Sequence, residues 1–137
     1  MKTSFNVKTQ GDTDIIEITD KIQSILSNSG IESGIVNVFV VGSTAGISFV
    51  EYEPGLIEDL QEVFEKIAPK HQYYHHHERW QDNNGNSHIR STLLKPDVTI
   101  PFENNKLSLG TWQQVVLFDF DTSARNREIL VTIISDR

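Results

Sequence analysis

The sequence contains no cysteine among its 137 residues. A disulfide framework, a thiolate nucleophile and a cysteine metal site are therefore excluded, and any metal has to be held by nitrogen and oxygen ligands. The absence of disulfides is compatible with a reducing compartment, and we expect a cytoplasmic protein.

Long apolar runs and positive charge are also scarce. No stretch approaches the roughly 20 apolar residues of a membrane-spanning helix, so we expect no association with a membrane. The chain has 12 lysines and arginines against 19 aspartates and glutamates, which gives a net charge of −7. This balance opposes binding to a nucleic-acid backbone, and a small phosphorylated metabolite is the partner that we expect.

Strand patterns dominate what is present. Alternating or continuous apolar segments predict strands at 3–9, 14–18, 34–41, 47–53, 97–102, 106–108, 113–121 and 127–135. Apolar stripes at helical spacing predict helices over 19–29 and from Pro54 to Ile67. We therefore predict one domain over 1–137, an α+β fold dominated by strands. Its core would be an antiparallel β-sandwich-like structure with two or three helices packed on it.

A third, short helix is predicted just before Pro96. Ser87 is suited to cap this helix, and Ile89, Leu93 and Leu94 would form its inward face. The polar segment between the second and third helices is expected to be a long connection.

The histidines are concentrated in that connection. All five lie between His71 and His88, among tyrosines, a tryptophan and charged side chains. Imidazole binds metals and transfers protons near neutral pH. Three interpretations are open: a metal site of imidazoles and a carboxylate, an acid–base site around a phosphate, and a solvated loop. The length of the connection and its large aromatic rings favour a functional segment.

His88 lies at the predicted start of the third helix. A helix N-terminus offers free backbone N–H groups and a partial positive charge, which favour anions and neutral imidazole. Arg90 follows two residues later, so a phosphate is expected at this helix start. The alternative is that Ser87 only caps an ordinary helix.

Two further candidates lie earlier in the chain. Glu51 continues the inward face of the predicted strand 47–53, where a carboxylate needs a cation or hydrogen-bond donors; the alternative is an edge position in water. The small-residue run from Gly42 to Gly46 includes the hydroxyls of Ser43 and Thr44. Its backbone could approach a ligand closely, but tight packing between two strands is the more common explanation.

Taken together, these blocks resemble the YjbQ family, also called the secondary thiamine-phosphate synthase family. The resemblance runs from end to end, and its carriers are Gly42–Ala45, Glu51–Gly55, Tyr74–His77, Asp82–His88, Ser91–Pro96 and Leu109–Gln114. The last two blocks are specific at this spacing. The resemblance implies a small β-rich α+β fold that assembles as a homotrimer, with the histidine segment forming a pocket near the subunit contacts.

The resemblance also implies an activity, with named residues. The implied reaction is a weak thiamine-phosphate synthesis, as a main or a side activity, which joins a pyrimidine methyl diphosphate to a thiazole phosphate and releases diphosphate. His76 and His88 would be the central catalytic histidines, and also the ligands of a bound metal, with Asp82 and Glu51 as carboxylate partners. Further contacts to the substrate and its phosphates are expected from Arg90, Ser43, Thr44, Trp80 and Gln113.

The chain departs from the family pattern within the site. Asn83 stands where relatives often carry a second acidic residue, and Asn86 where they often carry a histidine. Both changes weaken a metal site more than an anion site. Release of diphosphate needs a divalent cation, Mg²⁺ or Zn²⁺, or fixed cations. The second hypothesis is therefore a trimeric protein that binds a metal or a phosphorylated metabolite without catalysis.

Overall fold

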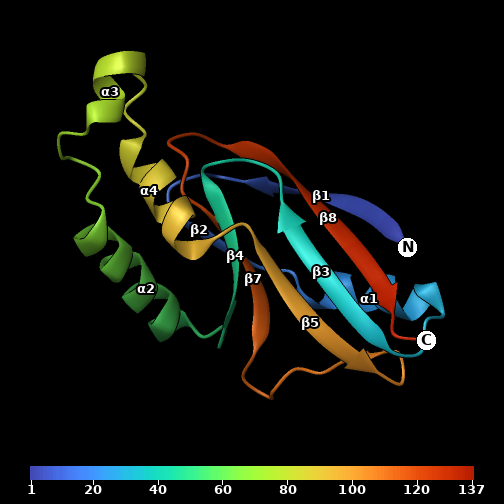
Figure 1. Cartoon of the computed structure of the whole chain (residues 1–137). Coiled ribbons are helices and arrows are strands. Elements are labelled where there is room, and N and C mark those ends of the chain that lie inside the picture. Colours follow the sequence, from blue (N-terminus) through green and yellow to red (C-terminus); the bar gives the residue numbers. More distant parts are fainter.

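The computed structural model describes all 137 residues, and its strands form two antiparallel sheets (Figure 1). The larger sheet has the order β1–β8–β3–β5–β6 and the smaller sheet has the order β2–β7–β4. The strands are β1 Lys2–Thr9, β2 Asp14–Glu17, β3 Gly34–Val40, β4 Ala45–Val50, β5 Asp97–Glu103, β6 Lys106–Leu107, β7 Gln114–Asp119 and β8 Arg125–Ser135. The predicted strands are therefore present, and the strand-dominated α+β fold class is confirmed.

The main core is built by residues that alternate along the strands. Inward residues of β3, such as Val36, Val38 and Val40, are fully buried, whereas their neighbours in the sequence point outward. Helix α1 (Thr19–Ser29) adds Ile22 and Leu26 to the same core. This burial of branched side chains on both sheets is the dominant stabilising contribution to the fold.

Helix α2 (Pro54–Ile67) covers a second, aromatic cluster on the smaller sheet. Pro54 occupies its first turn, and the Glu53 carboxylate accepts the first free backbone N–H groups. Phe64 packs against Phe118 and Phe120 with ring centroids 5.9 and 4.8 Å apart. These contacts fix α2 on the smaller sheet, and the histidine segment begins after the end of this helix.

The two remaining helices lie next to each other at one end of the molecule (Figure 1). Helix α3 (His75–Trp80) falls where a connection without regular structure was expected, so the chain has one helix more than predicted. Helix α4 (Gly85–Leu94) begins two residues before Ser87, so Ser87 lies inside the helix and does not cap it. None of the four helices combines the length and the apolar character needed to cross a bilayer.

The predicted inward face of α4 is wrong for Ile89 and Leu93, whereas Leu94 packs inward against the aromatic cluster as predicted. Ile89 and Leu93 are 40% and 58% exposed, whereas the buried residues of the helix are Gly85, Asn86, Ser87, Arg90 and Ser91. Ser91 Oγ donates to the Ala45 carbonyl at 2.6 Å, and a Cβ at Gly46 would lie 2.8 Å from Leu94. The helix sits so close to β4 that Leu94 and the Lys95 carbonyl leave no space for a side chain at position 46. Tight packing therefore explains Gly46 in the small-residue run.

Candidate functional site

Two histidines from different helices meet where α3 and α4 contact each other. The ring centroids of His76 and His88 are 4.6 Å apart, and the rings are inclined at 46°. Between the two helices the chain reverses through Gln81 and Asn83, which have left-handed φ angles of 54° and 58°. This reversal lays α3 against α4 and brings the two imidazoles together.

A carboxylate and an amide support His76. Its Nδ1 atom lies 3.3 Å from Asp82 Oδ1. With its amide in the orientation that satisfies both groups, Asn84 donates to the two oxygens of Asp82 at 2.8 and 3.2 Å. A carboxylate at Nδ1 fixes the orientation of an imidazole and leaves Nε2 for a ligand or a proton. Asp82 therefore has the position of a carboxylate partner of His76.

A cavity of about 460 Å³ opens beside this pair. It is lined by Gln72, Tyr73, Tyr74, His75, His76, Gly85, His88 and Ile89. The Tyr74 hydroxyl donates to the Pro69 carbonyl at 2.6 Å, and burial raises the pKa of this phenol, which keeps it a donor. A Cβ at residue 85 would lie 2.7 Å from Tyr74 Cβ, so glycine permits the close approach of Tyr74 to the start of α4.

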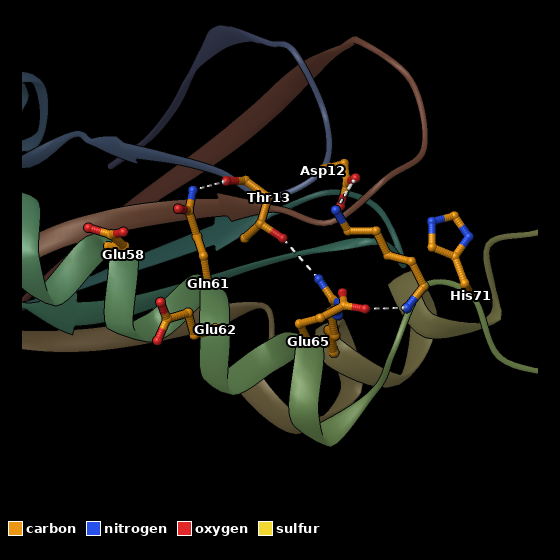
Figure 2. Close-up of a pocket in the computed structure, with 9 residues that line it drawn as sticks. Asp12, Thr13, Glu58, Gln61, Glu62, Glu65 and His71 are labelled. Atoms are coloured by element: carbon orange, nitrogen blue, oxygen red, sulfur yellow. Dashed lines mark hydrogen bonds and ion pairs between the residues drawn. The ribbon is translucent and has the colours of Figure 1, made fainter.

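The other histidines have separate surroundings. His77 Nδ1 accepts the backbone N–H of Asn83 at 3.1 Å, and His75 Nδ1 lies 3.2 Å from the Tyr73 hydroxyl. Because residues 75–77 are helical, successive side chains point about 100° apart. His76 is thus the member of the triple run that faces His88. His71 lies outside this site, at one end of a polar groove beside α2 (Figure 2).

Arg90 is buried on another side of α4. Its side chain is 1% exposed. The guanidinium donates to the Ala68 carbonyl at 2.8 and 3.1 Å, to Thr13 Oγ1 at 2.9 Å and to the Glu65 carboxylate at 2.9 Å. Burial raises the pKa of Glu65, but donation from the Lys70 backbone and from Arg90 outweighs it, and the pKa is lowered. The guanidinium anchors α4 to the end of α2, and the phosphate contact expected of Arg90 stays a prediction.

Glu51 and Gln113 lie away from the histidine pair. Glu51 belongs to the connection between β4 and α2, which is at the opposite end of the molecule from α3 (Figure 1). Glu51 is exposed, which agrees with the alternative that this carboxylate lies at an edge position in water. The Gln113 Oε1 atom accepts the backbone N–H of Gly110 at 2.8 Å and stabilises the turn before β7. Neither residue joins His76 and His88 within one chain.

The remaining candidates are also dispersed. Ser43 is exposed, and Thr44 is buried in an ion-pair network, where its hydroxyl accepts from Arg127 at 2.6 Å and donates to Asp121 at 3.0 Å. Trp80 is the last residue of α3 and is 63% exposed. The structure therefore groups His76, His88 and Asp82, and it leaves the expected contacts from the small-residue run and from Trp80 outside this group.

A metal would find two nitrogen donors here. No group of three or more histidine, aspartate or glutamate side chains is arranged to hold an ion. Catalytic zinc sites use three protein ligands, so the imidazoles of His76 and His88 fit such a metal as only part of a ligand set. Asp82 has the place of the carboxylate that supports a ligating histidine from behind.

Asn84 and Gly85 were not among the predicted site residues. Asn84 supports Asp82, and Gly85 admits the Tyr74 ring. The Asn-Gly pair is a turn signal, and it is the feature of the sequence that points to the reversal between the two helices.

Comparison with known proteins finds relatives along nearly the whole chain. A family model described as "UPF0047 protein YjbQ-like" matches residues 3–136. A UPF0047 protein of Methanothermobacter thermautotrophicus is 36% identical over 127 residues, which are 93% of this chain and 87% of the relative. A UPF0047 protein of Archaeoglobus fulgidus is 35% identical over 93% of this chain and 96% of the relative.

Solved structures give the same result. The crystal structure of a YbjQ-like protein of unknown function from Sulfolobus solfataricus has a TM-score of 0.89 at 29% identity, over 99% of both chains. That of a hypothetical protein from Aeropyrum pernix has a TM-score of 0.91 at 29% identity, also over 99% of both chains. The sequence match and the shared fold lead to one conclusion: this chain belongs to the YjbQ/UPF0047 family.

Proposed function

We propose that this protein is an enzyme acting on a phosphorylated heterocycle, with thiamine-phosphate synthase-type activity as a main or a side activity. The observation that carries the proposal is the meeting of His76 and His88, from two helices, beside a cavity and with Asp82 behind one ring. The relatives described above are named only as family members. The specific reaction therefore rests on the resemblance of the site blocks to the YjbQ, or secondary thiamine-phosphate synthase, family.

The chemistry requires groups of the kind found here. The bond from the pyrimidine methyl carbon to the diphosphate oxygen breaks, its electron pair leaves with diphosphate, and the thiazole nitrogen forms a new bond to that carbon. Donors placed at the leaving oxygen stabilise the charge that develops there. His76 and His88 line one cavity, and Asp82 lies 3.3 Å from Nδ1 of His76, so that its Nε2 is the nitrogen left for the substrate. The Tyr74 ring adds an aromatic wall against which a pyrimidine can stack.

A divalent cation is part of the proposal. His76 and His88 would hold Zn²⁺ through nitrogen, whereas Mg²⁺ prefers oxygen and would rely on Asp82 and the diphosphate itself. When bound, either ion supplies positive charge for the departing diphosphate.

We also propose that the protein acts in the cytoplasm as a homotrimer. Glu51 and Gln113 belong to blocks shared with the family, yet both are exposed and lie far from the histidine pair within one chain. A neighbouring subunit could supply them to the site. Apolar side chains on the outer face of the larger sheet support such contacts, since Ile35, Phe39 and Ile134 are 40%, 36% and 53% exposed. Light scattering after size-exclusion chromatography measures the assembly.

The proposed activity is tested by measuring the thiamine phosphate that forms from the pyrimidine methyl diphosphate and the thiazole phosphate. We expect His76→Ala and His88→Ala each to reduce the rate by about 10²–10⁴-fold, the contribution of a positioned acid–base group. His77→Asn is the matched control, because it removes a histidine from the same helix and keeps an acceptor for the Asn83 N–H. Wild-type rates in the double variant His76→Ala/His88→Ala would refute the proposal.

The second candidate is a trimeric protein that binds a metal or a phosphorylated metabolite without turnover. The observation that favours it is the solvent access of the site, since the side chains of His76 and Asp82 are 30% and 44% exposed, whereas catalysis gains from excluding water. Metal analysis of protein prepared without a polyhistidine tag distinguishes the two. Stoichiometric zinc that depends on His76 and His88, without product formation, would favour this candidate.

A further inference from the structure

A second, smaller cavity lies at the start of α4, next to the histidine site. Its volume is about 160 Å³ and it is lined by Asp12, Lys70, His71, Asn83, Asn86, Phe120 and Thr122. Through Asp12, Lys70 and His71 it adjoins the polar groove along α2. In Figure 2, Asp12 and His71 lie at one end of that groove and Glu58 lies at the other. The cavity is therefore at the end of the groove away from Glu58, and the nearest acidic side chain of α2 is Glu65, which accepts the backbone N–H of Lys70 at 3.1 Å.

Asn86 is the informative residue of this cavity. It is 3% exposed, yet its side-chain amide makes no hydrogen bond within the chain. Ser87 Oγ is the only fully enclosed side-chain polar atom without a partner, so the unpaired amide of Asn86 keeps access to the cavity that it lines. Because Asn86 lines the cavity, its amide is available to a ligand there.

The backbone around Asn86 adds further donors. Asn86 is the second residue of the ten-residue helix α4, and the side chain of the N-cap residue Asn84 makes no capping hydrogen bond. The first bonds to the Asn84 carbonyl come from the N–H groups of Ser87 and His88. The N–H groups of Gly85 and Asn86 are therefore free, at the end of the helix that carries partial positive charge.

The charges around the cavity favour an anion over a cation. Lys70 and His71 supply an ammonium and an imidazole. The opposing carboxylate, Asp12, is already in an ion pair with Lys70 at 2.8 Å. Free N–H groups, a lysine and an amide are the donors with which proteins bind tetrahedral oxyanions.

We propose that this cavity binds a phosphate group of the substrate. The assignment to a substrate rests on the proposed function, whereas binding of the oxyanion itself does not. Asn86 lines this cavity and its neighbour Gly85 lines the histidine cavity. A phosphate held here would lie beside the reacting centre at His76 and His88.

The test is the affinity of the full-length protein for inorganic phosphate, measured by isothermal titration calorimetry. We expect Asn86→Ala and Lys70→Gln each to weaken binding by about tenfold. Asp12→Asn is expected to strengthen binding, because it removes a negative charge and releases Lys70. Lys66→Gln is the matched control, since Lys66 is exposed on α2 and lines neither cavity. Circular dichroism and thermal unfolding establish that each variant is folded.

The sign of these changes decides the proposal. Weaker binding in Asp12→Asn, or unchanged affinity in folded Asn86→Ala and Lys70→Gln, would overturn it, and so would a wild-type protein without affinity for millimolar phosphate. The double variant His76→Ala/His88→Ala separates the two proposals, because it should lose synthesis and keep phosphate binding. Phosphate binding without any synthase activity would contradict the proposed function alone; synthesis without phosphate binding would contradict this site alone.

Discussion

A buried ion pair between the two sheets allows a quantitative prediction. Arg127 on β8 donates to both oxygens of Asp119 on β7 at 2.7 and 2.9 Å, and also to Thr44. The side chains of Arg127 and Asp119 are 8% and 0% exposed. Asp119 also accepts from the Thr9 hydroxyl and from the Asp121 backbone. The pair therefore joins the two sheets and compensates a fully buried carboxylate.

Arg127→Met removes the charge and keeps most of the apolar stem. Loss of one partner from a buried ion pair costs about 3–5 kcal/mol, because the remaining charge is left uncompensated. Asp119 retains its donors from Thr9 and Asp121, so we expect a value near the lower limit, about 3 kcal/mol. Domains are stable by only about 5–15 kcal/mol in total. The urea midpoint should therefore fall by about 1–3 M.

The assay is urea unfolding at pH 7 and one fixed protein concentration, followed by circular dichroism. The free energy of unfolding is compared for the wild type, Arg127→Met, Asp119→Asn and the double variant. In the Asp119→Asn background the loss from Arg127→Met should be much smaller, because the carboxylate that Arg127 binds with two hydrogen bonds is gone. The other nearby carboxylate, Asp121, lies 3.8 Å from Arg127 and keeps its closer ion pair with Arg125 at 2.7 Å. A loss below about 1 kcal/mol, the value typical of surface pairs, or equal losses in both backgrounds, would refute the reasoning.

Further predictions concern the site and its supports. Gly85→Ala places a Cβ within 3 Å of Tyr74, so we expect a loss of about 1–3 kcal/mol in unfolding experiments and a lower synthase rate. Arg90→Met leaves the Ala68 carbonyl without its donor, which should cost about 1–3 kcal/mol in the same assay. Burial raises the pKa of Asp121, but hydrogen bonds led by that from Arg125 outweigh it, so the pKa is lowered. Asp121 therefore stabilises the fold above about pH 4, and this contribution disappears as pH falls through its lowered pKa. The destabilisation by Asp121→Asn, measured by urea unfolding against pH, should shrink over that range.

The regular elements could be predicted from the sequence because their signals are local. The run of β-branched residues in β3 and the alternation in β1 follow the two-residue period of a strand. Gly30 ends α1 with a φ of 70°, the left-handed conformation that glycine adopts without strain. Helix α3 was missed because its residues, from His75 to Trp80, have no apolar stripe and none of them is buried.

The candidate site was predictable in part. Family-like blocks pointed to His76, His88 and Asp82, and the structure brings these three together. The sequence alone could not tell which of the three consecutive histidines would face His88, because that depends on whether the segment is extended or helical. Arg90 was assigned to a phosphate because of its closeness to His88 in the sequence, although the two side chains leave the helix in different directions.

The sequence by itself determined the composition of the chain, its strand and helix periods and the concentration of imidazoles in one segment. Only the tertiary structure decided how these groups are used. Arg90 is buried because Ala68 and Thr13, distant in the chain, surround it, whereas the Asn86 amide is left without a partner. The spacing of apolar residues in strands and helices follows from backbone geometry, so short stretches of sequence encode it. Burial and the pairing of charges depend on segments that meet only after folding.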